Sequence, residues 1–565
     1  MKFCDYKYER PNYEDYANKV NQLANKLKDT TSLDEACSII DEFNTLSGHV
    51  QSMAQLVSIR NSINTKDEFY ETEQEFIDEN SPKGDVAKNQ FNNVLLNHAL
   101  LPEFKKKYGT QWFESMEIQN KWFSEKIVDE LAEESKLVTR YEKLMASAKI
   151  SFDGKINNLS QMGVYAENPD REVRKAAELK KAEFYSSIQP ELDEIYDKLV
   201  KVRNRMAKKA GYDNYVEFGY YRLGRSDYNY KDVQKYRDII LRDVVPFSNK
   251  LREAQRKRLG VDKLKCYDLA LQFKDGDPNP RGTKDELVAK AYQMYSELSE
   301  ETKEFFKFMM NHDLLDLETK PNKRGGGYTD YLPEFKSPFI FSNFNGTSGD
   351  VDVLTHEAGH AFQVYSSSKK LSVPDIFWPT LEACEIHSMS MEFFTHPWME
   401  YFFGSDANKY RYKHTVESIL FLPYGVSVDE FQEYAYQNPD ATPEERRAKW
   451  REIEKKYTPY KDYDGIEFYE NGGFWQKQSH IYANAFYYID YTLAQICAFN
   501  FFLLDLKNHK DTFKQYQELC ELGGSESFFE LLKDTNQGNP FEDGVVKNCM
   551  KQLEKVVKKL EKEIL

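Results

Sequence analysis

The chain is short of the features that would mark a secreted or membrane protein. It has seven cysteines in 565 residues, an odd number with no CxxC pair. Scattered thiols argue against a disulfide-built domain and against a paired-cysteine zinc or redox motif. No window of about 18 apolar residues occurs, so no transmembrane helix is expected, and the first residues lack the apolar segment of a signal peptide. We therefore expect a reduced, cytoplasmic protein.

The chain also has fewer basic than acidic residues. Lysine and arginine total 77 against 93 aspartates and glutamates, which gives a formal net charge of −16. Nucleic-acid backbones and anionic membranes bind to positive fields. We therefore expect neither a nucleic acid nor a membrane as a partner. The sequence leaves the oligomeric state open, with a monomer favoured.

Helical patterning dominates the chain. Through most of the first 320 residues, apolar residues recur at three- and four-residue spacing, as in "EDYANKVNQLANKLKD", which is typical of amphipathic helices. Residues 321–350 are rich in Gly, Pro and Asn around one apolar run, Phe339–Phe341, and this predicts loop, strand, loop. From 380 onward the pattern is helical again. We expect a mainly α fold with one small sheet, divided into an N-terminal helical region, 1–200, and a second helical region, 201–565, which carries the motifs described next.

Two of the ten histidines lie four residues apart in "DVLTHEAGHAFQ", residues 352–363. On a helix, His356 and His360 fall one turn apart on one face, where two imidazoles can bind a single tetrahedral Zn²⁺. Glu357 lies on the flank of that face and can act as general base toward a metal-bound water. Ser348 or Asp350 can cap the start of this helix. The alternative is a chance HExxH, but the strand and helix start before the motif favour the zinc site.

A catalytic zinc needs a third protein ligand. The stretch "WPTLEACEIHSMSMEFF", residues 378–394, offers Glu382, Glu385, His387 and Glu392. On a helix Glu382 and Glu385 share a side, while His387 points about 200° away from Glu385, so the spacing leaves the two glutamates tied. Gly359, between the two histidines, suggests that another part of the chain approaches the helix closely there, because a helical glycine costs roughly 1 kcal/mol relative to alanine.

These motifs together resemble a known family. "GGGY", "PFIFSNFNGTSGDVDVLTHEAGHAFQ", "EIHSMSMEFF" and "SHIYANAFYYIDYTLAQICAFNFF" are similar to blocks of the thimet oligopeptidase and oligoendopeptidase F family of zinc peptidases, closest to the bacterial oligoendopeptidase F branch. The specific resemblance covers about residues 320–500. It implies Glu385 as the third ligand of one Zn²⁺ per chain, with Glu382 beside the site. It also implies an elongated helical zincin whose two halves enclose a deep substrate channel.

A late stretch, "SHIYANAFYYIDY", residues 479–491, offers groups that can stabilise an oxyanion. If it is helical, His480, Tyr487 and Tyr491 fall within about 20° of one another, with Tyr488 on the flank and Tyr482 on the far side. The resemblance implies that His480 and a tyrosine, most simply Tyr491, take this role. The alternative is a buried aromatic stripe, and the spacing differs from that of the thimet branch. The other histidines are assigned to core or surface: His49, His98, His312, His396, His414 and His509.

The run Phe339–Phe341 is interpreted as an edge strand that pairs with the substrate backbone. Gly326 and Gly327 before it, Asn345 and Gly346 after it, and Tyr487 and Tyr488 complete the expected substrate-binding set. The sequence thus predicts a zinc-dependent oligoendopeptidase that hydrolyses internal bonds of short unstructured peptides. A zinc exopeptidase is one alternative, although no sequence signature of a terminal-charge pocket is present. A non-catalytic peptide-binding protein is the other, and the intact Glu357 argues against it.

Overall fold

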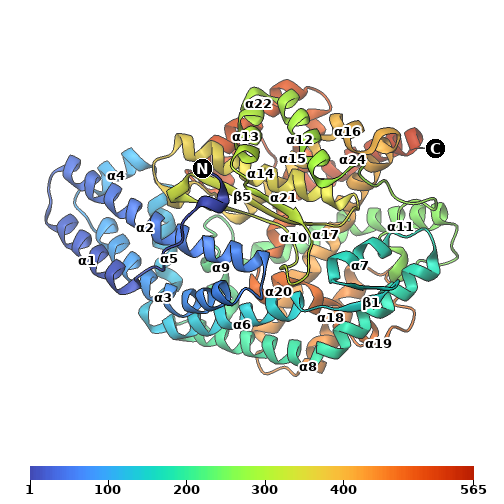
Figure 1. Ribbon diagram of the computed structural model, residues 1–565, viewed down its shortest axis with the longest axis horizontal. Coiled ribbons are helices and arrows are strands. Elements are labelled where there is room, and N and C mark those ends of the chain that lie inside the picture. The colour runs from blue at the N-terminus through green and yellow to red at the C-terminus, as the bar shows by residue number, and fades with distance from the viewer. Residues whose placement is uncertain (565) are drawn as a thin grey trace.

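The computed structural model describes residues 1–564, and α-helices make up most of it (Figure 1). The helices before residue 312 are α1 Tyr13–Asp29, α2 Leu33–Ile63, α3 Glu68–Leu96, α4 Leu101–Tyr108, α5 Gln111–Trp122, α6 Val128–Ala146, α7 Leu159–Ala166, α8 Arg171–Lys209, α9 Tyr215–Arg222, α10 Tyr230–Asp243, α11 Val245–Leu259, α12 Lys284–Leu298 and α13 Glu300–Asn311. The later ones are α14 Gly349–Lys370, α15 Leu381–Phe394, α16 Met399–Phe403, α17 Ala407–Gln437, α18 Pro443–Tyr457, α19 Glu467–Glu470, α20 Ser479–Ala483, α21 Tyr488–Asp505, α22 His509–Leu522, α23 Phe528–Asp534 and α24 Val545–Ile564. The predicted mainly α, elongated fold is confirmed.

Two small sheets interrupt the helices. A hairpin of β1 (Ile150–Phe152) and β2 (Lys155–Asn157) lies within the part of the chain predicted to be nearly all helix. The second sheet has the order β3-β5-β4, with β3 (Leu315–Glu318) parallel and β4 (Tyr328–Leu332) antiparallel to the central β5 (Ser337–Phe344). Its register pairs Tyr328 with Phe341. This is the small sheet expected beside the histidine helix, because α14 packs against both β4 and β5.

The central position of β5 corrects one prediction. We expected Phe339–Phe341 to form the edge strand that pairs with substrate, but β5 has a neighbour on both sides, and β4 is an edge of the sheet. Both faces of β5 are buried from Ser337 to Ser342, since α14 covers the sheet and Phe3 from the N-terminal segment contacts Phe339. A continuous apolar run is typical of a strand that is buried on both faces.

Two apolar cores hold the fold together. The larger includes residues from Phe3 to Val557 and contains the buried faces of α14, α15, α17 and α21. The smaller joins α1 to α5 and includes Val373 and Ile376. The blue N-terminal helices form one end of the molecule in Figure 1. The predicted division at residue 200 lies inside α8 and stays a prediction.

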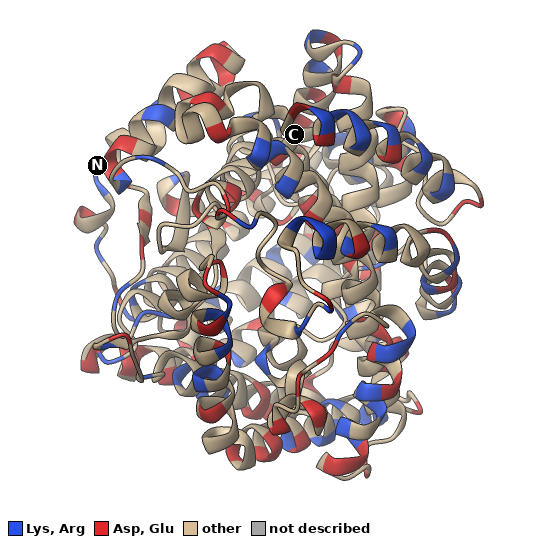
Figure 2. Cartoon of the chain, turned by 90° about the vertical axis from the view of Figure 1, so that its right-hand side faces the viewer, with Lys and Arg blue, Asp and Glu red and all other residues tan. Residues whose placement is uncertain are grey.

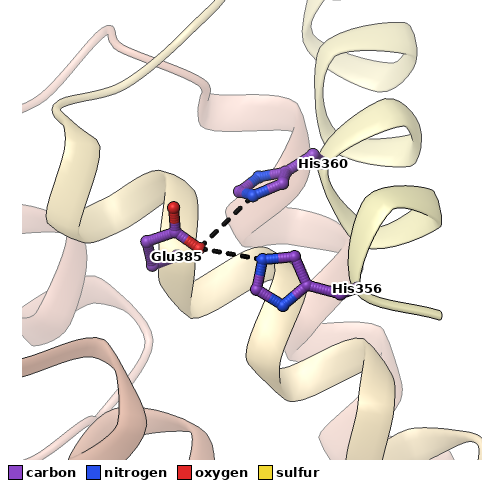
Figure 3. Close-up of side chains that lie close together, drawn as sticks. All are labelled: His356, His360 and Glu385. Atoms are coloured by element: carbon purple, nitrogen blue, oxygen red, sulfur yellow. Dashed lines mark ion pairs between the residues drawn. The ribbon is translucent and has the colours of Figure 1, made fainter. Parts of the chain in front are cut away.

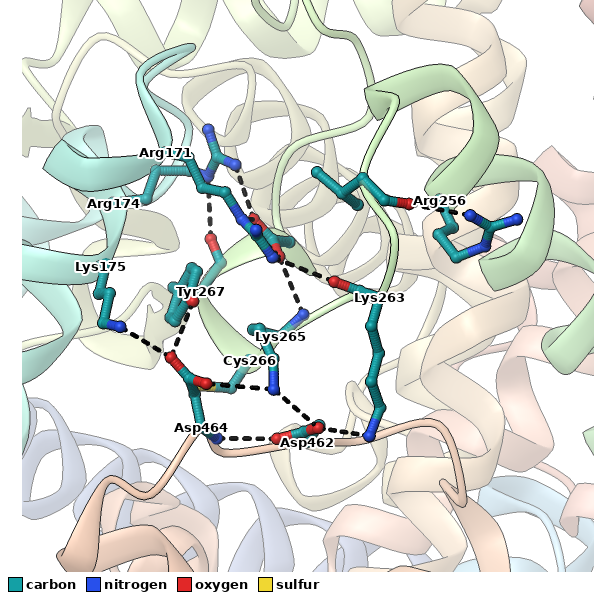
Figure 4. Close-up of polar contacts among 12 residues, drawn as sticks. Arg171, Arg174, Lys175, Arg256, Lys263, Lys265, Cys266, Tyr267, Asp462 and Asp464 are labelled. Atoms are coloured by element: carbon teal, nitrogen blue, oxygen red, sulfur yellow. Dashed lines mark hydrogen bonds and ion pairs between the residues drawn. The ribbon is translucent and has the colours of Figure 1, made fainter.

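A polar network fixes the start of α8 against two loops (Figure 4). The buried Asp268 carboxylate accepts hydrogen bonds from Arg171 and Arg174, each at 2.7 Å. Nearby, Asp464 lies 2.9 Å from Lys175 and 3.1 Å from Lys265. The network thus ties the segment around 464, which leads toward α20, to the long helix α8. The one fully buried pair, Arg174 with Asp268, adds little net stability, because the cost of removing both charges from water offsets much of their attraction.

Charges of both signs are interspersed over the helices seen from the side (Figure 2). The excess of acidic residues is therefore spread out in this view. None of the helices in residues 1–564 is both long enough and apolar enough to span a lipid bilayer.

Candidate metal centre and active-site cavity

The histidine helix, α14, begins where the sequence suggested, but by a different cap. Ser348 occupies the N-cap position without a side-chain capping bond, and its hydroxyl accepts a hydrogen bond from Lys413 Nζ at 2.9 Å. Asp350 instead accepts from the backbone N–H groups of Asn345 and Gly346, both at 2.8 Å. The Asp350 carboxylate thereby fixes the loop between β5 and α14, and so the direction in which α14 leaves the sheet.

His356, His360 and Glu385 converge at one point (Figure 3). Glu385 Oε2 lies 3.2 Å from His356 Nε2 and 3.3 Å from His360 Nε2, and the three ligand atoms all lie within 4.8 Å of one another. Metal–ligand bonds of about 2.0–2.2 Å in a tetrahedron separate adjacent ligand atoms by about 3.3–3.6 Å. Two imidazoles and one carboxylate at these distances therefore fit Zn²⁺, with room for a fourth ligand.

Electrostatics favour a cation at this point. Burial disfavours an ionised carboxyl, yet the neighbouring His360 and His356 hold the pKa of Glu385 well below its usual range. Burial also opposes charge on His356, yet the Glu385 and Glu392 carboxylates raise its pKa well above the ordinary value. Without a metal, His356 and Glu385 thus stabilise each other's charged forms. A divalent cation could replace the Nε2 proton of His356 and take over the positive charge that faces the carboxylate.

Glu357 stands beside this triad and is held in place by β4. The residue is 4% exposed, and Thr329 Oγ1 donates to Glu357 Oε2 at 2.8 Å. Burial raises the pKa of the Glu357 carboxyl above its ordinary value, which suits a proton acceptor that must later return the proton. Gly327 also bounds the site, because a Cβ there would lie 3.2 Å from Glu357 Oε1 and 2.8 Å from Val353 Cγ1.

A chain of hydrogen bonds extends from the back of His356 into the core. Its Nδ1 lies 2.6 Å from Glu392 Oε1, and the other oxygen, Oε2, lies 2.6 Å from His414 Nε2. His414 Nδ1 in turn lies 2.9 Å from His396 Nε2. With the Nδ1 proton of His356 donated to a carboxylate, its Nε2 lone pair is free for a metal.

From the sequence, Glu392 was predicted only as a candidate ligand, and His396 and His414 were assigned to core or surface. The seven-residue spacing from Glu385 to Glu392 could have indicated that Glu392 lies near the candidate ligands. Seven residues complete nearly two helical turns, so both carboxylates lie on one side of α15. His396 and His414 carried no such signal.

The helix α15 brings Glu385 to the triad by close contact with α14. An ideal Cβ on Gly359 would lie 2.7 Å from both His387 O and Ser388 Cα. The close approach predicted for Gly359 is therefore that of the α15 backbone. Glu382, the candidate tied with Glu385, is buried away from the cavity lining, in the field of the Arg225 guanidinium.

His480 and Tyr491 lie side by side, although the stretch that carries them is not one helix. α20 ends at Ala483 and α21 begins at Tyr488, so the common helical face predicted for 479–491 is wrong. Phe486 has a φ of +65°, and this left-handed residue turns the chain between the two helices. The turn brings His480 Nε2 to 3.2 Å from Tyr491 Oη.

The hydrogen bonds of His480 define which proton it presents. Gln478 Nε2 donates to His480 Nδ1 at 2.8 Å, and the Gln478 amide is oriented by Tyr424 Oη on its Oε1 at 2.9 Å. The Nδ1 atom is thus an acceptor, and Nε2 carries the proton toward Tyr491. Burial lowers the pKa of His480 to about 4, so the ring is a neutral N–H donor at neutral pH.

The remaining tyrosines of this stretch separate in space. Tyr487 Oη donates to Glu385 Oε1 and lines the cavity, whereas Tyr488 is not among the cavity-lining residues. Tyr488 lies over His480 with ring centroids 5.0 Å apart. Tyr482 is fully buried and stacks on Tyr141. Burial, with the Glu385 carboxylate, raises the pKa of Tyr487 and Tyr491 well above the ordinary value, so both are neutral phenols.

The triad opens into a cavity of about 1000 Å³. Its volume is at the upper end of the range for small-molecule sites. One wall comes from α6 and α8, with Tyr141, Met145 and Tyr185, and the opposite wall comes from α14, α15 and the start of α21. The cavity therefore lies between the N-terminal helices and the helices that carry the triad.

The edge of β4 forms part of this wall. Residues 325–330, including Gly326 and Gly327, line the cavity, as does Asn345. Gly346 is not among the lining residues in the described chain, and the N–H groups of Asn345 and Gly346 already bond to Asp350. The backbone available to an extended ligand is therefore that of β4, not the segment after β5.

Comparisons with known proteins agree with this arrangement. The model of the "Peptidase M3 N-terminal domain" matches residues 3–123, and that of "Peptidase family M3" matches residues 164–551. A curated relative, "Oligoendopeptidase F, chromosomal" of Lactococcus lactis subsp. cremoris, is 26% identical over 218 residues, 38% of this chain and 34% of the relative. The match thus spans about a third of that relative's length.

Solved structures match over nearly the whole chain. A structure of PZ peptidase A with an inhibitor is 48% identical, covers 99% of each chain and has a TM-score of 0.98. A Bacillus anthracis str. Ames protein assigned as an oligoendopeptidase F is 45% identical, with 100% of this chain and 99% of that chain covered and a TM-score of 0.94.

Proposed function

Because this chain belongs to peptidase family M3, we propose that it is a zinc-dependent oligoendopeptidase that hydrolyses internal bonds of short, unstructured peptides. One observation carries the proposal. His356, His360 and Glu385 converge at zinc-ligand distances on the wall of a large cavity, with Glu357 beside them on the same wall. Metal-assisted peptide hydrolysis needs a set of metal ligands and, next to it, a carboxylate that can act as general base.

The donor set would hold one Zn²⁺ per chain. When bound, the ion supplies Lewis acidity, which lowers the pKa of a coordinated water and polarises the scissile carbonyl. Glu357 takes the proton of the attacking water and delivers it to the leaving amine. His480 Nε2–H and the Tyr491 hydroxyl are neutral donors on the cavity side, and they stabilise the negative charge that develops on the carbonyl oxygen.

Substrate selection follows from the shape of the cavity. An extended peptide can add to the free edge of β4 through backbone hydrogen bonds, which demand little of its side chains. The walls formed by α6 and α8 would exclude a folded chain, because only an extended strand reaches the triad between them. Loose sequence preference and strict size selection are therefore expected together.

The experiment is a length series of peptides blocked at both ends, assayed beside casein and a stable globular protein. Products mapped by mass spectrometry should show internal cleavage of blocked peptides, while the globular protein stays intact. Activity should vanish with a chelator and return with zinc. The control is Glu357→Gln, which should keep bound metal and lose about 10² to 10⁴-fold in turnover.

The possible outcomes separate the alternatives. Cleavage that requires a free terminus identifies an exopeptidase. Peptide binding without cleavage by any wild-type preparation identifies a binding protein. Efficient cleavage of the globular protein at internal sites refutes size selection by the cavity walls, and an active Glu357→Gln refutes the base role.

A further inference from the structure

The turn between α20 and α21 adopts a conformation that its residue does not favour. Phe486 has a φ of +65° although it is not a glycine, and a bulky L-residue in the left-handed region is strained. Its side chain is fully buried. Such a conformation persists only where the surroundings hold it in place.

Two buried side chains form hydrogen bonds with the backbone N–H and C=O groups of Phe486. Gln432 on α17 accepts a hydrogen bond from Phe486 N at 3.0 Å. Arg225, in the segment after α9, donates from Nη2 to Phe486 O at 2.6 Å. The same Nη2 lies 2.6 Å from Asp490 Oδ1. Gln432, the Arg225 side chain and Asp490 are all fully buried.

The positions of these contacts along the chain link them to the cavity. Phe486 directly precedes Tyr487, and Asp490 directly precedes Tyr491. Arg225 thus contacts the residue before each of the two cavity tyrosines, while it does not itself line the cavity. A shift at Phe486 would change where α21 begins and would move both hydroxyls.

We propose that Arg225 and Gln432 are positioning residues that fix the Phe486 peptide and thereby place Tyr487 and Tyr491 at the metal centre. This role rests on the proposed function. It explains why an arginine is buried here with Nε and Nη1 lacking any hydrogen-bond partner within residues 1–564. Buried ion pairs are often no more stabilising than apolar replacements, so a gain in geometry accounts for this arginine better than a gain in stability.

The test uses Arg225→Met and Gln432→Met in the full-length, zinc-loaded chain, with Arg174→Met as the matched control. Arg174 is also a buried arginine, 2% exposed, that bonds a buried carboxylate, Asp268, and backbone carbonyls (Figure 4). It lies at the start of α8 and does not contact the α20–α21 turn. Arg174→Met therefore removes a buried positive charge, as Arg225→Met does, but leaves the hydrogen bonds of Phe486 in place.

Two readouts are needed. Amide hydrogen exchange followed by mass spectrometry should speed up by about tenfold or more in peptides covering 481–491 for both test variants, and should not change there for Arg174→Met. With a blocked peptide below the melting temperature, kcat should fall about 100-fold at nearly constant KM and constant zinc content for the test variants. The control should keep kcat within about twofold.

Unchanged exchange in 481–491, or accelerated exchange with unchanged kcat, would overturn the positioning role. So would an equal loss of kcat in Arg174→Met, since the effect would then be general destabilisation. If Arg225→Met does not fold, Gln432→Met decides alone, because it removes a neutral group. If the wild-type chain cleaves no peptide, the proposed peptidase function is refuted. If the wild type is active and the variants are unaffected, only the positioning role of Arg225 and Gln432 is refuted.

Discussion

A single methyl group at Gly327 should disable the enzyme without removing its metal. An ideal Cβ on this residue would lie 2.8 Å from Val353 Cγ1, 3.2 Å from Glu357 Oε1 and 3.4 Å from Phe341 O. Val353 is fixed on α14, so the conflict is relieved by moving β4 away from α14 or by displacing the Glu357 carboxylate. A Cβ on Gly325, two residues earlier on the same loop, would meet no atom within 4 Å, and neither glycine has a positive φ.

The magnitude follows from these contacts. Overpacking a tight site costs about 1–3 kcal/mol of stability, which a large domain tolerates at assay temperature. The catalytic cost is greater, because a shift of about 1 Å in a reacting group lowers the rate about 100-fold. We therefore expect Gly327→Ala to lose about 100-fold in kcat, and Gly325→Ala to stay within about threefold of wild type.

The assay is cleavage of a blocked fluorogenic peptide, with zinc content and melting temperature measured on the same preparations. Gly327→Ala should carry wild-type zinc, because the triad lies on α14 and α15 and not on the loop. Wild-type kcat in Gly327→Ala would refute the argument that the space beside Glu357 is required. An equal loss in Gly325→Ala would refute it as well, since loop flexibility would then explain both variants.

Four further variants test the metal centre and His480 beside it. Glu385→Ala should fall well below one zinc per chain by elemental analysis, while Glu382→Ala keeps its zinc; the reverse order would move the third ligand to Glu382. Glu392→Gln should weaken zinc binding about 10- to 100-fold in chelator competition, because His356 loses its carboxylate partner; unchanged affinity would contradict that support. His480→Gln should lower kcat without moving the acidic limb of the pH–rate profile, because a folded pKa of about 4, below the ordinary 6.5, leaves the ring neutral above about pH 5. A limb that shifts with this substitution would show that His480 titrates in the working range.

The parts of the site that sequence could predict are those set by one helix. His356, Glu357 and His360 lie within five residues, and the 3.6-residue period alone places them on adjacent faces. The candidate third ligand lies on a second helix, so spacing left Glu382 and Glu385 tied. The distances that favour Glu385 depend on how α15 packs on α14, and helical periodicity within α15 carries no information on that packing.

Two predictions failed because tertiary contacts overrode a local pattern. The run Phe339–Phe341 was interpreted as an edge strand, yet an apolar strand next to loops has the same sequence pattern whether it has one neighbour or two. The common face of 479–491 was expected on the condition that the stretch is one helix, but Arg225 and Gln432, distant in sequence, hold Phe486 in a left-handed turn. His480 and Tyr491 still meet, through the turn and not through helical phase.

Close packing of helices sets the spacing of the candidate catalytic groups. Gly359 lets the α15 backbone approach α14 where a Cβ would be 2.7 Å from His387 O. Gly425 on α17 leaves room for a side chain of α21, since a Cβ there would lie 2.2 Å from Thr492 Cγ2, next to Tyr491. Contacts this close leave little freedom for the groups that the helices carry. Helix packing therefore positions Glu385, the candidate ligand on α15, and it adds to the constraint that the Phe486 turn places on Tyr491. A pre-positioned site needs little rearrangement when charge develops in the transition state.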